Sequence, residues 1–421
     1  MKNKFNIAFV GMSHLGLNSA VASSNYVRKI LCIDPQKEKI DKIKNFKLDY
    51  GEPGLTKRLK QFKNKFFFST QFNLLERADL IYLATDTKTD KNNVSNFSII
   101  RKLFKKIIKN KNKKTPVIIL SQVFPGFTEN LVSSKNKEVY YQVETLIFGK
   151  ALSRATHPER IIVGCDDEKR EFNKKYHDYL KKFKCKIIKT NYQSAELTKI
   201  AINLFLISSV TLSNSLAEIS KKLNADWNKI SSALKLDKRI GPHAYLKPGL
   251  GISGGNLERD LENILKLVKF KKVNSVHKKL FLNFKYISNH MSYWVERKIN
   301  KILSLKKIKN IGILGISYKE NTNSIKNSRA VEIIKKYSKK INIFGYDPLA
   351  KINNVKNFTQ LDNINEIIKK TEVIIIMNSW KQFFNLENKI NKTGVCKYII
   401  DPFAIVNKDK LKKKKIYMSL V

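Results

Sequence analysis

The sequence predicts an α/β protein whose two strand-rich ends are joined by a long central helix. Near the N-terminus, the apolar run Asn6–Val10 leads into a glycine-containing turn and then a helical pattern. From Asn310 onward, short apolar runs again alternate with helical patterns. A long stretch of helical periodicity with little glycine lies between them, reaching about Leu305. Alternating strands and helices are typical of parallel sheets covered by helices. We therefore expect two Rossmann-like domains joined by a long central helix.

The composition is that of a globular chain with a strongly basic charge. Its 421 residues are enough for two or three domains, and a hydrophobic content of 42% excludes a disordered chain. The net charge of +47 would suit a protein that binds nucleic acid or an anionic membrane. Because the lysines are spread over every segment, we favour a general drift in composition and expect no nucleic-acid partner. A basic surface would still attract a polyanionic small substrate.

The cysteines and the apolar segments favour a cytoplasmic protein. The chain has four widely spaced cysteines and no CxxC motif: Cys32, Cys165, Cys185 and Cys396. This pattern favours free thiols in a reducing compartment and no metal site. The most apolar long window, Ile200–Leu216, is interrupted by asparagines and serines, so we expect a core helix and no membrane insertion.

The first turn has the strand–turn–helix context that a dinucleotide-binding fingerprint requires. Gly11 would make the tight turn, and Gly16 would complete the motif at the start of the helix. The usual middle glycine is replaced by Ser13, which keeps the side chain small. Asp34 follows the next strand, Lys29–Ile33, where a ribose-binding carboxylate belongs. The pattern predicts a nucleotide site and favours NAD over NADP.

Polar side chains follow two further strand-like runs. Thr85 comes after Leu80–Ala84, and Ser121 comes after Val117–Leu120. Ligands of open α/β sheets lie at the carboxyl ends of the strands. Both residues are therefore candidate cofactor contacts, with ordinary capping of the strand ends as the alternative.

Four polar residues farther along lie in or beside apolar runs. Glu144 ends an apolar, strand-like run, which suits a general base or a water-positioning acid, or else a solvated edge residue. Ser194 is expected to cap a long helix. Lys199 and Asn203 lie four residues apart in that helix and so share one face. Either the two side chains form one wall of an active site, or Lys199 simply extends its ammonium group to solvent.

The most unusual stretch is 247–260, which combines four glycines with an acid/base cluster at its end. The glycines are Gly249, Gly251, Gly254 and Gly255. Glycine permits positive φ angles and lets a ligand approach the backbone. A functional loop is favoured here over a flexible connector.

The C-terminal part repeats the first theme in a shorter form. The strand-like run Ile311–Gly315 is followed by another that ends in Asp347. Two such halves on either side of a helix suggest that two nucleotide-bearing ligands meet in a central cleft.

Taken in order, these motifs resemble the UDP-glucose/GDP-mannose dehydrogenase family. The resemblance runs from residue 11 to residue 401. The matching segments, besides the first fingerprint, are 52–55, 125–126, 144–149, 158–161, 195–199 with 203, 239–241, 248–260 and 315–319 with 328. It implies a cytoplasmic, NAD-dependent oxidoreductase of the UDP-glucose 6-dehydrogenase type.

The resemblance also implies a division into domains. Residues 1–192 would bind NAD, 193–306 would form a central helical domain for dimerisation and the active site, and 307–421 would bind the sugar nucleotide. A homodimer would form through the central helix.

Members of the family oxidise the C6 alcohol of a sugar nucleotide through an aldehyde and a cysteine thioester to a carboxylate. By resemblance, Lys199 would hold the developing oxyanion, and Asn203 would help to position it or a water. Asp260 would act with Lys199 in proton transfer, and Glu144 would support hydrolysis.

Four further residues are candidate substrate contacts, the two charged ones by resemblance and the two glycines by their place in the loop. Arg239 would reach the sugar site of the partner subunit, and Lys319 would hold the nucleotide end of the substrate. Gly249 and Gly251 would let it approach the loop.

The chain departs from the family pattern at the nucleophile. Asn256 stands where the family has its cysteine, and a carboxamide cannot attack an aldehyde as a thiolate does. We therefore expect a dehydrogenase with an altered second oxidation, or alternatively a catalytically silent sugar-nucleotide binder. Four other positions also differ from the family: Gln122, Ser253, Lys326 and Phe403.

Overall fold

The computed structural model describes residues 5–48, 51–90, 93–132, 138–252 and 255–421. Ser253 and Gly254 of the glycine-rich stretch lie outside these residues. The chain forms two compact units, Met1–Ile202 and Asn203–Val421. The three-domain division expected at residues 192 and 306 stays a prediction.

The first unit is built on one sheet with the strand order β10-β9-β8-β7-β4-β1-β2-β3. Its strands pair in parallel, except for β8 with β9. The strands are β1 (Asn6–Val10), β2 (Lys29–Ile33), β3 (Phe66–Ser69), β4 (Leu80–Leu83), β7 (Val117–Ile119), β8 (Val139–Gln142), β9 (Arg160–Cys165) and β10 (Lys186–Asn191). A small antiparallel ladder joins β5 (Lys88–Thr89) to β6 (Ser95–Asn96).

Helices accompany this sheet, and both of its faces are apolar. The helices are α1 (His14–Ala22), α2 (Lys37–Lys44), α3 (Leu55–Gln61), α4 (Ser98–Asn110), α5 (Phe127–Leu131), α6 (Ala151–Thr156) and α7 (Lys174–Leu180). Ile7 and Phe9 of β1 belong to one buried cluster, and Ala8 and Val10 belong to another. Successive side chains of a strand point to opposite faces, so β1 is buried on both sides, as expected for a central parallel strand.

The strand order changes direction at β1, which has β2 on one side and β4 on the other. Val10 pairs with Ile33 and with Leu83, so all three strands end at the same edge. In open α/β sheets, this is where ligands bind.

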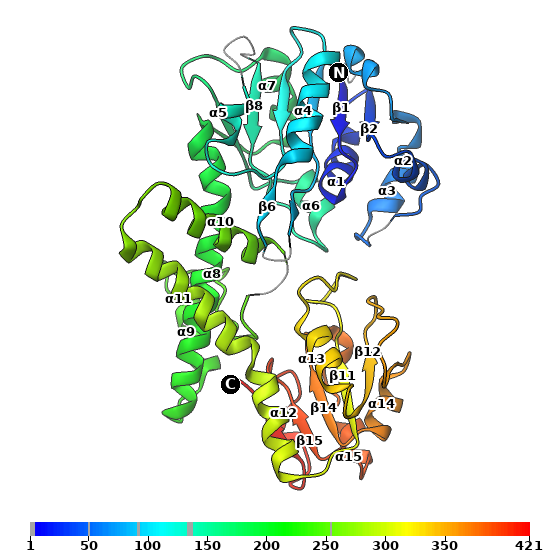
Figure 1. Ribbon diagram of the computed structural model, residues 1–421, viewed down its shortest axis with the longest axis vertical. Coiled ribbons are helices and arrows are strands. Elements are labelled where there is room, and N and C mark those ends of the chain that lie inside the picture. Colours follow the sequence, from blue (N-terminus) through cyan, green and yellow to red (C-terminus); the bar gives the residue numbers. More distant parts are fainter. Residues whose placement is uncertain (1–4, 49–50, 91–92, 133–137, 253–254) are drawn as a thin grey trace. The chain divides into compact units, whose positions relative to one another are not determined.

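The second unit begins within the long helix α8 (Tyr192–Lys222), drawn in green in Figure 1. Four more helices follow in the chain: α9 (Trp227–Leu236), α10 (Asn256–Phe270), α11 (Ser275–Ser292) and α12 (Trp294–Leu305). The expected cap at Ser194 is wrong, because Ser194 lies inside α8. The side chain of Asn191 accepts the N–H of Ser194 at 2.8 Å and so caps the helix.

Among the described helices, α8 is the one long and apolar enough to cross a membrane. Its asparagine Asn214 is nevertheless buried and bonds to the backbone of Gly249. Its Lys221 donates to the carbonyl of Ser419 at 2.6 Å. Such contacts are those of a helix that packs within a protein.

The second unit also contains a parallel sheet, with the strand order β13-β12-β11-β14-β15-β16. The strands are β11 (Asn310–Leu314), β12 (Asn342–Tyr346), β13 (Phe358–Gln360), β14 (Val373–Ile376), β15 (Tyr398–Ile400) and β16 (Ile416–Met418). Figure 1 shows these strands in yellow to red together with α13 (Arg329–Tyr337), α14 (Ile364–Lys370) and α15 (Glu387–Lys392). The expected fold, two Rossmann-like sheets and a long central helix, is confirmed.

Candidate active site

The turn after β1 requires both of its glycines. Gly11 has a φ of +99°, and a Cβ there would lie 2.8 Å from the Cβ of Thr85. A Cβ at Gly16 would lie 1.7 Å from the carbonyl oxygen of Gly11. The hydroxyl of Ser13 accepts the N–H of Asp86 at 2.9 Å. The helix α1 therefore packs directly against the turn, which is tied to the end of β4.

Asp34 closes this turn from the end of β2. Its buried carboxylate accepts N–H groups from Met12 at 2.8 Å and Gln36 at 3.0 Å. It also pairs with the ammonium group of Lys39 at 3.1 Å. Two carboxylate oxygens offer about four acceptor positions, so one remains for a ligand.

Thr85 and Ser121 lie together at the neighbouring strand ends. The N–H of Thr85 donates to the hydroxyl of Ser121 at 3.0 Å, and that hydroxyl donates to the carbonyl of Leu83 at 3.3 Å. Both residues are buried. These bonds cap the strand ends, and direct contact with a cofactor stays a prediction.

Glu144 and Lys199 form a nearly buried ion pair in the first unit. The ammonium group of Lys199 lies 3.5 Å from the carboxylate of Glu144, with side chains 7% and 13% exposed. Glu144 also accepts the N–H of Leu146. Lys199 is thus not a lysine that reaches out to solvent, and Glu144 is not a solvated edge residue.

A second polar pair joins α8 to α10. The side-chain amide of Asn203 donates to Asp260 at 2.5 Å, and Arg259 donates to the other carboxylate oxygen at 3.2 Å. Asp260 is fully buried. Asn256 is the first residue of α10, one helical turn ahead of Asp260.

The glycine-rich loop is anchored rather than flexible at its described residues. The N–H of Gly249 donates to Asn214 of α8 at 2.8 Å. Gly251 has a φ of +82°, and a Cβ there would lie 2.5 Å from the carbonyl oxygen of Ser288 in α11. The hydroxyl of Ser288 also accepts the N–H of Ile252 at 2.9 Å.

The loop and α10 also contact the C-terminal sheet and its loops. The ammonium group of Lys247 lies 5.9 Å from the ring centre of Phe403 and 3.4 Å from the hydroxyl of Ser379. Glu258, in the first turn of α10, accepts a hydrogen bond from the side chain of Asn327. The start of α10 is therefore fixed at the carboxyl edge of the second sheet.

The turn after β11 repeats the geometry of the first turn. Gly315 has a φ of +97°, and a Cβ there would lie 2.3 Å from the side-chain oxygen of Asn378. Asp347 accepts the N–H groups of Ile316 at 2.7 Å and Ser317 at 2.9 Å. The hydroxyl of Ser317 and two further N–H groups also donate to Asp347. Its carboxylate is saturated, unlike that of Asp34.

Three models of one protein family match the chain. The NAD binding domain of the UDP-glucose/GDP-mannose dehydrogenase family matches residues 5–183. The central domain matches residues 193–283, and the UDP binding domain matches residues 312–408. The chain belongs to this family. It is an NAD-dependent nucleotide-sugar dehydrogenase that acts on CH–OH donors.

Relatives match this dehydrogenase over nearly its whole length. The UDP-glucose 6-dehydrogenase of Rickettsia felis is 27% identical over 420 residues, which cover 95% of this chain and 91% of the relative. The UDP-glucose 6-dehydrogenase YwqF of Bacillus subtilis is 27% identical over 403 residues, which cover 90% of this chain and 89% of the relative.

Solved structures show the same fold at lower identity. A UDP-glucose dehydrogenase from Pyrobaculum islandicum has a TM-score of 0.86 and 20% identity, covering 99% of this chain and 98% of that one. The UDP-D-ManNAc dehydrogenase of Pyrococcus horikoshii has a TM-score of 0.83 and 20% identity, covering 99% of both chains.

The residues at the Gly11 turn of the dehydrogenase fit NAD. The glycines leave room for the backbone to approach a pyrophosphate, and the N-terminus of α1 favours negative charge. Asp34 keeps an acceptor position for a ribose hydroxyl. A pocket of about 320 Å³ borders the turn and is lined in part by Met12, Ser13 and His14.

Two buried glutamates of the dehydrogenase position these parts, and neither was assigned a role from the sequence. Glu196 of α8 accepts the N–H groups of Gly126 at 2.6 Å and Thr128 at 2.8 Å, and its burial raises its pKa. It fixes α8 to the start of α5, beyond the end of β7. A carboxylate within an apolar helical run, three residues before Lys199, was the available signal.

Glu52 braces the start of α1. It pairs with His14 at 3.0 Å and accepts the N–H groups of Gly149 at 3.0 Å and Ala151 at 2.7 Å. Burial opposes ionisation of Glu52, but these hydrogen bonds outweigh it and lower its pKa. The ring of His14 also stacks on Phe148, with ring centres 4.1 Å apart.

The predicted substrate residues Arg239 and Lys319 lie in different surroundings. The side chain of Arg239 is 89% exposed and pairs with Asp237 at 2.6 Å. Lys319 is half-buried in the loop after β11, with its ammonium group 5.6 Å from the ring centre of Tyr318. Among the described residues, no group of three or more His, Cys, Asp or Glu could hold a metal ion.

Proposed function

We propose that the dehydrogenase oxidises the C6 hydroxyl of a UDP-sugar and that Asn256 alters the second oxidation. The proposal rests mainly on the position of Asn256. This residue begins α10 and precedes the buried Asp260 by four residues. A UDP-sugar is favoured over a GDP-sugar by the match to the UDP binding domain. Relatives named UDP-glucose 6-dehydrogenase support the same choice.

In the first oxidation, the C6 hydroxyl loses a proton and a hydride and becomes an aldehyde. NAD, when bound, supplies the hydride acceptor. Lys199 offers a buried positive charge and hydrogen-bond donors to the C6 oxygen as negative charge develops there. Glu144 keeps the Lys199 ammonium group in place, and Asp260 is assigned to proton transfer. Asn203 holds the Asp260 carboxylate in one orientation.

Thioester formation needs a thiolate, and the four cysteines of the chain are poor sources of one. All four are free thiols, and Cys32, Cys165 and Cys396 are buried. Burial raises the pKa of each, that of Cys396 to about 12. Thiols with raised pKa values are largely protonated at neutral pH and react slowly. These free thiols also support the proposed cytoplasmic location.

Without the thioester, two outcomes are open to the aldehyde. It leaves as the product, or its hydrate loses a second hydride directly and becomes a carboxylate. Oxidation of the hydrate requires a base to remove a hydroxyl proton, and Glu144 and Asp260 are the candidate bases. The first oxidation consumes one NAD and releases one proton. Oxidation of the hydrate to the carboxylate consumes a second NAD and releases two protons.

The deciding experiment counts NADH per sugar. Purified protein is incubated with excess NAD and a limiting amount of one UDP- or GDP-sugar from a panel, with hydroxylamine in a parallel sample to trap aldehyde. We expect either one NADH with a trapped aldehyde, or two NADH without a covalent intermediate on the enzyme. Two NADH together with a trapped enzyme thioester would contradict the altered second step. Ligand binding with no NADH from any sugar would instead indicate a silent binder.

We also infer that the protein is a homodimer held through its central helices. Large apolar side chains on α8 are exposed, among them Phe205 at 78% and Leu212 at 61%, and Leu223, directly after the helix, is 72% exposed. Exposed apolar patches of this kind mark protein interfaces. A second copy, presenting the same self-complementary patch, is the simplest partner for such a surface.

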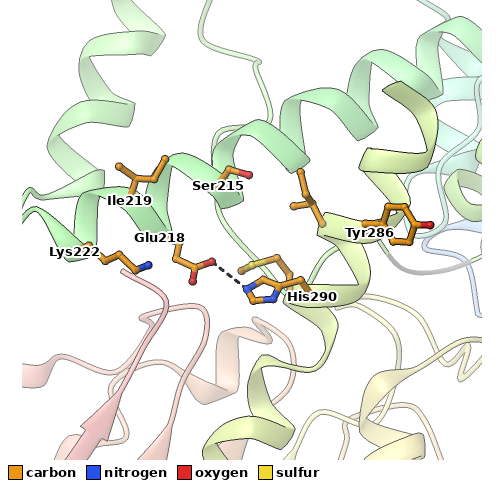
Figure 2. Close-up of a pocket in the computed structure, with 8 residues that line it drawn as sticks. Ser215, Glu218, Ile219, Lys222, Tyr286 and His290 are labelled. Atoms are coloured by element: carbon orange, nitrogen blue, oxygen red, sulfur yellow. Dashed lines mark hydrogen bonds and ion pairs between the residues drawn. The ribbon is translucent and has the colours of Figure 1, made fainter. Parts of the chain in front are cut away.

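A groove of about 410 Å³ between α8 and α11 continues this surface. Figure 2 shows Glu218 of α8 and His290 of α11 facing each other across it, 3.2 Å apart. The apolar side chains of Ile219 and Tyr286 also line the groove and are exposed. The groove offers a second copy both apolar contacts and a polar pair.

A further inference from the structure

Three lysines line the pocket that borders the Gly11 turn, where the adenosine ribose of a dinucleotide is expected. They are Lys39, Lys42 and Lys47. The pocket has a volume of about 320 Å³ and is also lined by the carboxylate residue Asp86. Lysines thus outnumber carboxylates in the lining of this pocket. Two of them also pair with carboxylates outside that lining, Lys39 with Asp34 at 3.1 Å and Lys42 with the exposed Glu38 at 3.3 Å.

The negative charge of Asp34, at the end of β2, is balanced by an ion pair in this structure. A carboxylate at this position normally disfavours a 2′-phosphate, because it binds the ribose hydroxyl and repels negative charge. Here the ammonium group of Lys39 lies 3.1 Å from Asp34, and the two side chains are 30% and 5% exposed. A partly buried pair of this kind is screened less by salt than an exposed pair. Asp34 therefore repels a phosphate less than an unpaired carboxylate would.

The local backbone brings the other two lysines to the same place. Lys42 lies three residues after Lys39 on α2 and so shares its face. Phe46 lies two residues after the end of α2 and adopts the left-handed region, with a φ of +57°. The backbone N–H of Lys47 donates to the carbonyl oxygen of Lys42 at 2.9 Å. The backbone N–H of Phe46 donates to the carbonyl oxygen of Ile43 at 3.0 Å. This helix-terminating turn folds Lys47 back toward the pocket.

We infer that this pocket accepts a ribose 2′-phosphate, so that the dehydrogenase binds NADP as well as NAD. Lys39 and Lys42 are the specificity-determining residues, acting as point charges on the phosphate oxygens. The inference concerns only the adenosine end of the cofactor. It is independent of whether the second oxidation occurs.

The test uses two adenosine fragments that differ by one phosphate. Binding of 5′-AMP and of adenosine 2′,5′-bisphosphate to the full chain is measured by isothermal titration calorimetry at low and high salt. We expect the bisphosphate to bind at least as tightly as 5′-AMP at low salt and to lose more affinity as salt rises. Bisphosphate binding more than about tenfold weaker than that of 5′-AMP, about 1.4 kcal/mol, would overturn the inference.

Variants separate a specific role from a structural one. In Lys39→Gln/Lys42→Gln, affinity for the bisphosphate should fall about tenfold or more, while affinity for 5′-AMP should change less than about twofold. The matched control is Lys44→Gln, an exposed residue of the same helix that does not line the pocket. An equal loss for both fragments, or an equal effect of the control, would refute the assignment. Initial rates with NADP and NAD provide a second readout.

Discussion

The side-chain amide of Asn203 donates a 2.5 Å hydrogen bond to the fully buried carboxylate of Asp260. Asn203 lies on α8 and Asp260 on α10, so this bond fixes two helices that are far apart in the sequence. A buried carboxylate is costly when it lacks partners, and Arg259 also donates to Asp260 here.

Removing this amide should destabilise the protein. In Asn203→Ala, Asp260 loses a donor in a buried site, so the free energy of unfolding should fall by about 1–3 kcal/mol. Urea denaturation monitored by circular dichroism measures the change. The control is Asn289→Ala on the exposed side of α11, which should change stability by less than about 0.5 kcal/mol. Equal stability of both variants would show that the bond contributes nothing.

Restoring a thiol at the start of α10 should restore the family's second step. Asn256→Cys places a cysteine at a helix N-terminus, where the helix dipole lowers a thiol's pKa. We expect two NADH per sugar and sensitivity to iodoacetamide, measured by absorbance and mass spectrometry. Asn289→Cys, an exposed thiol elsewhere, is the control and should leave the stoichiometry of the parent. If Asn256→Cys forms no enzyme thioester that mass spectrometry detects, Asn256 is not what alters the second step.

Neutralising the lysine of the Glu144 pair should slow the first oxidation. Lys199→Ala removes the charge expected at the C6 oxygen and leaves Glu144 without its ion-pair partner. We expect kcat to fall by about 10²–10³, as for loss of an oxyanion donor, with little change in NAD affinity. The exposed Lys235 of α9 supplies the control, Lys235→Ala. A fall in NAD affinity without a fall in kcat would place Lys199 elsewhere in the mechanism.

Acid should weaken the first unit partly through Glu52. The pKa of Glu52 is lowered in the folded state, so its ionised form stabilises the fold above its ordinary value of 4.5. That contribution is lost as pH falls from about 4.5 through the lower folded pKa. Glu52→Gln should therefore have a lower Tm than the parent protein at neutral pH. Its Tm should also fall less than that of the parent protein as the pH is lowered. The Tm is measured by scanning calorimetry between about pH 7 and pH 3. Parallel pH profiles for both proteins would argue against this role.

Charge placed on the exposed face of α8 should dissociate the dimer. In Phe205→Glu/Leu212→Glu, two carboxylates replace apolar side chains that we assign to the interface. We expect the molar mass from light scattering to fall from dimer to monomer. Phe67→Glu, on the exposed side of β3, should leave the mass unchanged. A wild-type protein that is already monomeric would disprove the interface.

Several features were predictable from the sequence because they depend on neighbours in the chain. The apolar run Asn6–Val10 followed by Gly11 specifies a buried strand and a tight turn, since only local periodicity and one positive φ angle are needed. The alternation of strands and helices predicted both parallel sheets. The spacing of motifs along the chain also indicated the family.

The tertiary structure alone decided which distant side chains meet. Glu52 and His14 lie 38 positions apart, and Glu196 and Gly126 lie 70 apart. Their pairing depends on how helices pack on the sheet, which no local pattern encodes. The neutralisation of Asp34 by Lys39 also required coordinates, because the rotation of α2 about its axis decides which lysine faces the carboxylate. Local periodicity selects the elements, whereas burial and close packing select the contacts between them.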